Sequence, residues 1–219
     1  MKILIIGSKG RLGRTLMDIF PGAKGIDIED NNMDQELEEA EITFLAVPLK
    51  VTIALISKYP YYRKFVDLTS IKSPMKEYSG KIISIHPMFG PSSYKMNKDI
   101  LFITDISIEN SIKTISELFR EYNVIPLTAD EHDELMGELL VKPYILSYIC
   151  DSHEYSIETS SHKKLLNLLS IKYNENQEII IDTIILNNSA RKIIVEMEER
   201  LEYLKKLNIL LHKSYSYFR

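Results

Sequence analysis

The sequence has one cysteine, no hydrophobic run long enough to span a bilayer and no excess of basic residues. The lone Cys150 excludes an internal disulfide and cannot build a cysteine-based zinc site alone, as is typical of a protein from the reducing cytoplasm. The net charge of −4 excludes a global basic field that would recruit nucleic acid. The first apolar run breaks at Gly7, too early for a signal peptide. We therefore expect a soluble cytoplasmic protein that binds neither nucleic acid nor a membrane, and we assign no metal site.

Short apolar runs alternate with segments of helical spacing through the first 130 residues. The runs lack strict polar alternation, which is typical of strands covered on both faces in a parallel sheet. The expected strands cover residues 3–6, 42–47, 65–68, 82–85, 100–104 and 123–127, and the expected helices cover residues 11–20, 51–58 and 111–122. This alternation predicts a doubly wound, Rossmann-type α/β domain over residues 1–129.

From Asp130 the pattern becomes helical. Acidic residues open a helix that we expect to run to about Cys150, with a kink at Pro143. The polar residues 151–161 predict a loop, and a second long helix is expected from about residue 176 to 212. We therefore predict a small all-helical domain over residues 130–219. The apolar stripe within 179–204 would suit a homodimer, and an intramolecular core is the alternative.

A glycine-rich motif joins the first expected strand to the first expected helix. It consists of Gly7, Ser8, Lys9, Gly10, Arg11, Leu12 and Gly13. Glycines three residues apart allow a tight turn, close approach of the backbone to a pyrophosphate, and close packing of the helix on the strand. Between a strand and a helix, the motif predicts a dinucleotide site, with a ligand-free glycine turn as the alternative.

Two further segments fit a dinucleotide. Asp27 lies 20 residues after Gly7 and is the candidate acceptor for the adenosine ribose hydroxyls, with Asp30 as second choice and a solvated acidic turn as the alternative. A carboxylate there repels a 2′-phosphate and no arginine follows it, so NAD is favoured over NADP. The strand expected over residues 42–47 ends in a turn that resembles the lining of the nicotinamide side in such domains, or that is an ordinary strand terminator. That turn consists of Ala46, Val47 and Pro48.

An imidazole directly follows the strand expected over residues 82–85. It opens the hexapeptide His86, Pro87, Met88, Phe89, Gly90 and Pro91. A rigid turn at the end of a buried strand is how α/β enzymes aim a side chain at the ligand-binding edge. His86 is therefore the candidate catalytic residue, because an imidazole with a pKa near 6.5 is a suitable base at neutral pH.

Three motifs follow the glycine loop in a fixed order: residues 67–72 (DLTSIK), residues 86–91 (HPMFGP) and residues 131–133 (EHD). In this combination the chain resembles the prephenate dehydrogenase family of tyrosine biosynthesis. The match covers the α/β part nearly end to end and continues more weakly to residues 188–192. The resemblance implies NAD-dependent oxidative decarboxylation of prephenate to 4-hydroxyphenylpyruvate and CO2, in a homodimer formed through the helical domain.

The resemblance also implies roles for individual residues. His86 would accept the proton of the substrate ring hydroxyl, and Ser70 would hydrogen-bond the same hydroxyl or His86. Arg191 would clamp the side-chain carboxylate of the substrate through a bidentate pair. Lys72 would help hold the anionic substrate. His132 would either contribute to the substrate site or only stabilise the domain junction.

The chain departs from the family in its helical part, which at about 90 residues is shorter than usual. Residues 140–144 lack the histidines and the serine of many relatives, so either Lys142 or Tyr144 compensates or the substrate preference differs. Arogenate is an alternative substrate. Because Lys142 lies on the first long helix of the helical part, a β-hydroxyacid or imine oxidoreductase on the same fold is a second alternative. A catalytically silent nucleotide sensor is the alternative from another functional class. A chorismate mutase activity lacks the clustered basic residues that it would need.

Overall fold

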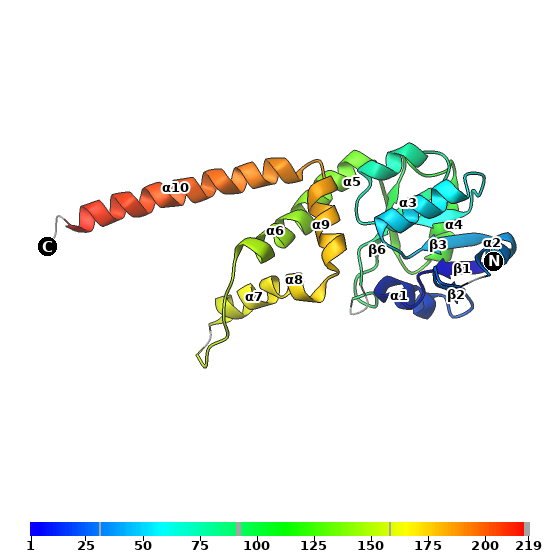
Figure 1. Cartoon of the computed structure of the whole chain (residues 1–219), viewed down its shortest axis with the longest axis horizontal. Coiled ribbons are helices and arrows are strands. Elements are labelled where there is room, and N and C mark those ends of the chain that lie inside the picture. The colour runs from blue at the N-terminus through cyan, green and yellow to red at the C-terminus, as the bar shows by residue number, and fades with distance from the viewer. Residues whose placement is uncertain (31, 91–92, 158, 217–219) are drawn as a thin grey trace.

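A computed structural model of the chain describes residues 1–30, 32–90, 93–157 and 159–216, with side chains described to residue 208 (Figure 1). In these ranges the chain forms a seven-stranded sheet in the order β2-β1-β3-β4-β5-β6-β7. The strands are β1 (Ile3–Ile6), β2 (Lys24–Ile26), β3 (Ile42–Leu45), β4 (Phe65–Asp67), β5 (Ile83–Pro87), β6 (Asp99–Ile103) and β7 (Asn123–Leu127).

The first five strands are parallel, so their carboxyl ends share one edge of the sheet. The strand order reverses between β1 and β3, which is the point where doubly wound sheets bind ligands. β6 runs antiparallel to β5, and β7 runs parallel to β6. The predicted α/β fold is confirmed, and the reversal of β6 and β7 is a feature that the apolar runs do not reveal.

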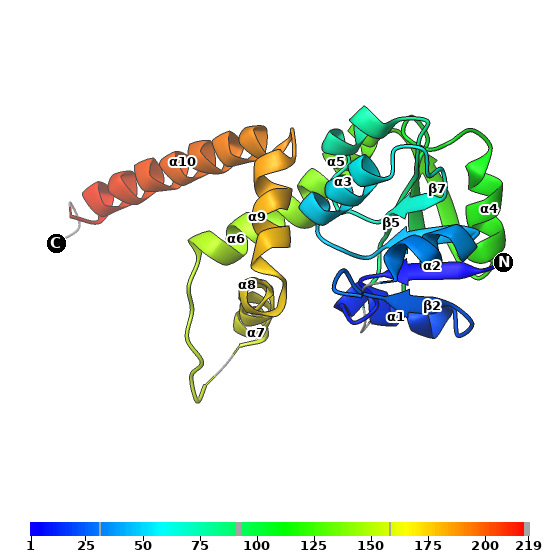
Figure 2. The same ribbon diagram turned by 45° about the vertical axis from the view of Figure 1, so that its right-hand side comes forward.

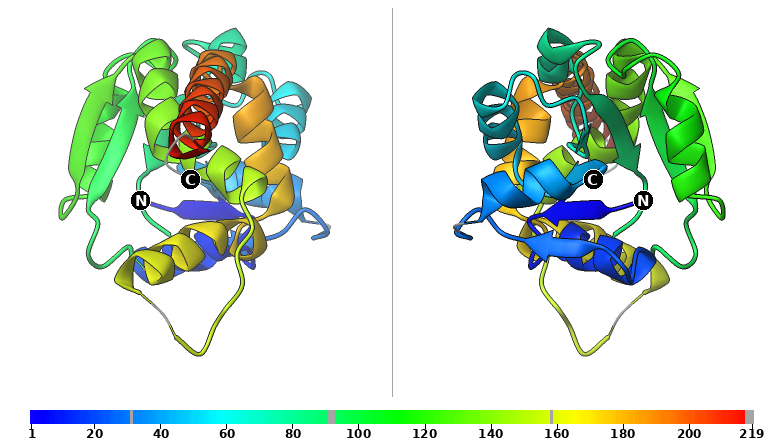
Figure 3. Two further views of the ribbon diagram at one scale, coloured as in Figure 1. Left: turned by 90° about the vertical axis from the view of Figure 1, so that its left-hand side faces the viewer. Right: turned by 90° about the vertical axis from the view of Figure 1, so that its right-hand side faces the viewer.

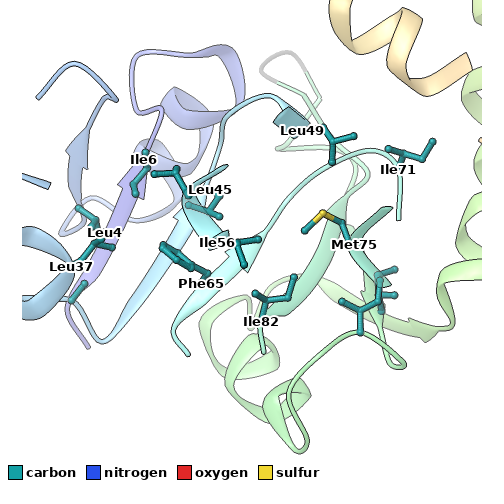
Figure 4. Packing of buried hydrophobic residues seen from close by; sticks show 14 of the residues in the cluster. Leu4, Ile6, Leu37, Leu45, Leu49, Ile56, Phe65, Ile71, Met75 and Ile82 are labelled. Carbon is teal, nitrogen blue, oxygen red and sulfur yellow. The ribbon is translucent and has the colours of Figure 1, made fainter. Parts of the chain in front are cut away.

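Helices cover both faces of the sheet because successive residues of each strand point to opposite sides and both sides are apolar. In β1, Leu4 and Ile6 belong to one buried cluster and Ile5 to the other. The first cluster, which Figure 4 shows, includes side chains from α2 (Met33–Glu39), α3 (Leu49–Lys58) and the 3-10 helix η1 (Ser73–Tyr78). The second includes side chains from α1 (Arg11–Ile19) and α4 (Ser111–Leu118).

The remaining residues are helical and follow the sheet in sequence. They form α5 (Ala129–Met136), the π-helix η2 (Gly137–Val141), α6 (Lys142–Ile149), α7 (Ser160–Leu169), α8 (Ile171–Asn174), α9 (Gln177–Leu186) and α10 (Ala190–Ser216). A small apolar core joins η2, α6 and the start of α10. Beyond this core α10 extends away from the other helices (Figure 2). Within the described ranges every helix is too short or too polar to cross a bilayer.

Pro143 is accommodated without ending the helix. The chain stays helical from α5 through η2 to α6, and the wide π-turn lies immediately before Pro143. Proline cannot donate to the carbonyl four residues earlier, and a π-helix is one way to absorb that loss. The helix predicted to run to about Cys150 thus continues through Pro143, and a π-helix over residues 137–141 precedes the proline.

The prediction of a single helix over residues 176–212 is wrong. The structure has two helices there, α9 and α10, which are separated at Asn187. The side chain of Asn187 makes two hydrogen bonds that hold the chain in a turn. Its amide oxygen accepts the N–H of Ser189, and its amide nitrogen donates to the carbonyl of Asp133 on α5. The apolar spacing continues across the break, which is why the sequence conceals it. The division into domains at residues 129 and 130 stays a prediction.

Candidate functional site

The glycine motif forms a tight turn from β1 into α1. Gly7 has a φ of +86°, and a Cβ on it would lie 2.4 Å from the carbonyl oxygen of Ala46. A Cβ on Gly13 would lie 2.0 Å from the carbonyl oxygen of Gly7. Both glycines are therefore required by the close approach of backbone segments. The turn brings the start of α1, where the first N–H groups lack partners within the helix, to the end of β3, as a pyrophosphate site requires.

Asp27 follows the last residue of β2 and faces this turn. Its Oδ2 accepts hydrogen bonds from Ser8 Oγ at 3.2 Å and from the N–H of Lys9 at 3.3 Å. Lys9 Nζ lies 3.7 Å from the same oxygen. Asp30 instead accepts the backbone N–H of Asp27 at 2.7 Å and so supports the turn. The geometry places Asp27, rather than Asp30, beside the glycine loop.

The end of β4 carries a buried ion pair. Asp67 and Lys72 are both fully buried, with Lys72 Nζ 2.7 Å from Asp67 Oδ2. Lys72 Nζ also donates to the carbonyl of Ile85, the residue before His86. Thr69 and Ser84 donate their hydroxyls to Asp67, so the carboxylate is fully hydrogen-bonded. Burial lowers the pKa of Lys72, while Asp67 opposes that shift.

This position corrects the role expected of Lys72. A side chain with no exposed surface, whose ammonium is bound to Asp67 and to a carbonyl, cannot contact a substrate. Lys72 instead fixes the end of β5 by holding the carbonyl of Ile85. The sequence interpretation missed this because it did not pair Lys72 with the aspartate five residues earlier in the same motif.

His86 lies at the end of β5 and meets His132 from the first turn of α5. His86 Nδ1 and His132 Nε2 are 3.0 Å apart, and His132 Nδ1 is 2.8 Å from Asp133 Oδ1. His132 has no exposed surface, so it does not reach a substrate, and the direct substrate role given to it is also corrected. His86 retains 8% exposure. Pro91, the last residue of its hexapeptide, lies outside the described residues.

The imidazole pair is neutral at neutral pH. Burial, together with His132 and Lys72, lowers the pKa of His86 well below 6.5. Burial also lowers the pKa of His132, against the opposing hydrogen bond to Asp133. For Asp133, burial alone would raise the pKa of the carboxyl, but hydrogen bonds from His132, Ser73 and a backbone N–H outweigh it and lower that pKa. Asp133 is therefore a carboxylate next to the neutral ring of His132, which in turn contacts the neutral ring of His86.

Asp133 connects three parts of the chain. Its Oδ1 accepts the N–H of Lys72 at 3.0 Å, and its Oδ2 accepts the N–H of Ser73 at 2.9 Å as well as the Ser73 hydroxyl. On the other side, Asn188 Nδ2 donates to Ser73 Oγ at 3.1 Å, so the turn before α10 is bound to the same point. The sequence interpretation assigned Asp133 no role, although its place beside His132 in the EHD motif was a usable signal.

Ser70 and Arg191 are less constrained than His86. Ser70 is half-buried, and no hydrogen bond from its side chain to the described residues is present, so His86 bonds to His132 rather than to Ser70. Arg191 is exposed in the first turn of α10, three residues after Asn188, and has no ion pair among the described residues. Both side chains remain available for a ligand.

Tyr144 on α6 is buried near the contact between the two parts of the chain. Burial and the nearby Glu175 raise the pKa of its hydroxyl to about 12, against an opposing effect of Arg11. Arg11 of the glycine motif donates to Glu175 at 2.8 Å and to the carbonyl of Asn174 at 2.7 Å. The end of α8 thus lies beside the start of α1 (Figure 3). Lys142, by contrast, is paired with Glu138.

No protein-family model matches the chain. Among curated proteins, the T-protein of Enterobacter agglomerans is 26% identical over 153 residues, which cover 62% of this chain and 40% of that protein. The probable arogenate/prephenate dehydrogenase of Methanocaldococcus jannaschii is 26% identical over 129 residues, which cover 52% of this chain and 29% of that protein. The matches thus span less than half the length of these relatives.

Among solved structures, prephenate dehydrogenase from A. aeolicus, in complex with hydroxyphenyl propionate and NAD+, aligns with 95% of this chain and 91% of its own. The TM-score is 0.68 at 13% identity, so this match concerns the fold. The resemblance to the prephenate dehydrogenases is confirmed. The three motifs that carry this resemblance are joined in the structure, because Lys72, His86 and His132 belong to one hydrogen-bonded group centred on Asp133.

Proposed function

We propose that the chain is an NAD-dependent dehydrogenase that converts prephenate to 4-hydroxyphenylpyruvate and CO2. The observation that carries the proposal is the state of His86 at the carboxyl edge of the sheet. It is a neutral imidazole, held at Nδ1 by His132, and its Nε2 has no partner among the described residues. The similarity to curated and solved prephenate dehydrogenases supports the same reaction.

The residues at this edge fit a dinucleotide. Gly7 and Gly13 let β1, α1 and β3 pack more closely than a Cβ would allow, and Oδ1 of Asp27, which has no hydrogen-bond partner among the described residues, suits ribose hydroxyls. The nearby Ala46, Val47 and Pro48 join β3 to α3 at the same edge. Asp27 favours NAD over NADP. When bound, the nicotinamide supplies the hydride acceptor.

His86 is the proposed base. It lies three strands from Gly7, which corresponds to about 14 Å along the sheet edge. As hydride leaves the carbinol carbon of prephenate, Nε2 takes the hydroxyl proton. Loss of CO2 from the ring carboxylate then makes the ring aromatic, and the proton returns to the oxygen as the phenol forms. Ser70 is proposed to orient the same hydroxyl. The protein mainly positions groups, because aromatisation supplies the driving force.

Arg191 is proposed to bind the side-chain carboxylate, and Tyr144 to line the same site. An exposed guanidinium without an ion pair among the described residues can form the bidentate pair that a carboxylate prefers. Lys142 does not favour an imine reductase, because its ammonium is paired with Glu138. The homodimer through the helical part and the cytoplasmic location stay predictions.

The direct test follows NADH formation at 340 nm with purified full-length protein. Prephenate and arogenate are each offered with NAD+ and with NADP+. We expect turnover with prephenate and NAD+, and a higher kcat/KM for that pair than for the other three. Turnover of arogenate alone would move the proposal to an arogenate dehydrogenase. The absence of turnover with every pair would contradict the proposed function.

A further inference from the structure

The hydrogen bonds around His86 define where its proton lies. Asp133 accepts four hydrogen bonds, from the N–H groups of Lys72 and Ser73, from the Ser73 hydroxyl and from His132. Such a carboxylate is an acceptor only. The ring atom that faces it, Nδ1 of His132, must therefore carry a hydrogen.

The second step concerns His132. A neutral imidazole has one N–H, and burial keeps this ring neutral. Because that N–H points to Asp133, Nε2 of His132 is a bare lone pair. This lone pair lies 3.0 Å from Nδ1 of His86. The contact is a hydrogen bond only if His86 carries its own hydrogen on Nδ1, which leaves Nε2 of His86 as the lone pair.

We propose that Asp133 and His132 are positioning residues that keep the proton of His86 on Nδ1 and present Nε2 as an acceptor. Only this tautomer can take a proton at Nε2. All buried side-chain nitrogens and oxygens among the described residues have a partner, so the unpaired Nε2 is the accessible end of His86. The consequence for catalysis rests on the proposed function, whereas the tautomer itself does not.

The backbone of His86 is held by the same group of residues. Lys72 Nζ binds the carbonyl of Ile85, and the N–H of Lys72 binds Asp133. Ring and backbone are thus both anchored to one carboxylate. This arrangement explains why a buried aspartate and a buried histidine, neither of which can touch a substrate, occur together in the first turn of α5.

The test reads the tautomer directly. Full-length protein labelled with ¹⁵N-histidine is examined at pH 7.5 by two-bond ¹H–¹⁵N correlation, which distinguishes an Nδ1–H ring from an Nε2–H ring and from an imidazolium. His86→Gln and His132→Gln identify the two signals, and His162→Gln is the control outside the group. We expect both His86 and His132 as Nδ1–H tautomers. A wild-type His86 found as Nε2–H, or as an imidazolium, would overturn the proposal.

A second comparison separates positioning from packing. His132→Phe keeps a ring but removes the acceptor for His86 Nδ1, whereas His132→Gln places an amide oxygen near the former Nε2. We expect His86 to lose its Nδ1–H pattern in the Phe variant and to keep it in the Gln variant. A folded Phe variant with an unchanged His86 spectrum would overturn the proposal. If the Phe variant does not fold, the wild-type spectrum still shows which tautomer His86 adopts and so tests the proposal.

Kinetics then link the tautomer to the proposed reaction. His132→Phe is expected to lower kcat about 100-fold with little change in KM, and His132→Gln to restore part of the rate. Equal kcat in the wild type and a folded Phe variant would exclude the positioning role. Asp133→Asn is less suitable, because an amide nitrogen would face one of the two backbone N–H donors. If no substrate is turned over, the spectra still test the tautomer, so the two proposals fail separately.

Discussion

At the carboxyl edge of the sheet the polar side chains are buried and paired, whereas in the helical part the proposed substrate ligand faces solvent. Asp67, Lys72 and His132 have no exposed surface and are fully hydrogen-bonded, while Arg191 is exposed and has no ion pair among the described residues. The proposed base is therefore positioned before any substrate arrives, and the proposed substrate clamp is not. This division suits a reaction in which the base must select one hydroxyl while binding adapts to an anion.

The largest expected effect is on His86. His86→Asn removes the proposed base and should lower kcat about 10²- to 10⁴-fold with little change in KM. In the wild type, the acid limb of kcat/KM should lie below pH 6.5, because burial, His132 and Lys72 lower the pKa of this imidazole. Steady-state kinetics from pH 5 to 9 measure both, with His162→Asn as the control. An Asn variant with near wild-type kcat would show that another residue is the base.

Substitution of Lys72 tests how much the buried ion pair stabilises the carboxyl edge of the sheet. Lys72→Met leaves the carboxylate of Asp67 buried without its cation and should cost about 3–5 kcal/mol of unfolding free energy. Lys76 lies on the neighbouring helix η1 and pairs with Asp130 at the surface, so Lys76→Met should cost less than about 1 kcal/mol. Urea unfolding compares the two. Equal losses would mean that the burial of the pair has no energetic consequence.

The glycine loop tests the dinucleotide site. Gly13→Ala puts a Cβ 2.0 Å from the carbonyl oxygen of Gly7, so the loop must move. A displacement on this scale should weaken NADH binding about 100-fold, as measured by fluorescence titration. Gly22→Ala is the matched control, since nothing lies within 4 Å of its Cβ. If Gly13→Ala leaves the Kd for NADH unchanged, the cofactor does not bind at this loop.

Substitution of Arg191 tests whether this exposed side chain binds the substrate carboxylate. Arg191→Gln should raise KM for prephenate about 10- to 100-fold with little change in kcat, because it removes charge-assisted hydrogen bonds to a carboxylate. The free energy of unfolding should not change, since the side chain has no ion pair among the described residues. Lys192→Gln, the neighbouring exposed cation, is the control. An unchanged KM in the Arg191 variant would assign the clamp to a different residue.

The difference between buried and exposed residues also explains which features the sequence could predict. Apolar runs mark the buried strands, and each strand that the sequence predicted corresponds to a strand of the sheet, although the residues of β7 are exposed or half-buried. A run such as residues 100–104 has the same composition in either direction, and the antiparallel course of β6 is therefore set by its pairing with β5. The motif residues were recognised, but motif membership does not indicate exposure. Lys72 was therefore taken for a substrate ligand, and His132 for either a substrate ligand or a support of the domain junction, although buried partners account for both.

Partners far apart in sequence caused the remaining errors. His86 meets a ring 46 residues away, and Asn187 bonds to a carbonyl 54 residues away. Such pairs leave no periodic signal, since each residue alone reads as an ordinary polar residue. The broken helix at Asn187 and the Asp133 group are two results of the same long-range contacts.

The smallest expected effect concerns how the two parts are joined. Glu175 pairs with Arg11 at the surface, where an ion pair contributes less than about 1 kcal/mol, so Glu175→Gln should lower Tm by less than about 4 °C. Asn187→Ala removes a buried hydrogen bond to Asp133 and the acceptor for the N–H of Ser189 in the turn before α10, and should cost about 1–3 kcal/mol. Calorimetry of both variants, with the exposed Glu199→Gln as control, ranks the two contacts. A larger loss for Glu175→Gln than for Asn187→Ala would mean that the surface ion pair, rather than the buried Asp133 group, joins the helices to the sheet.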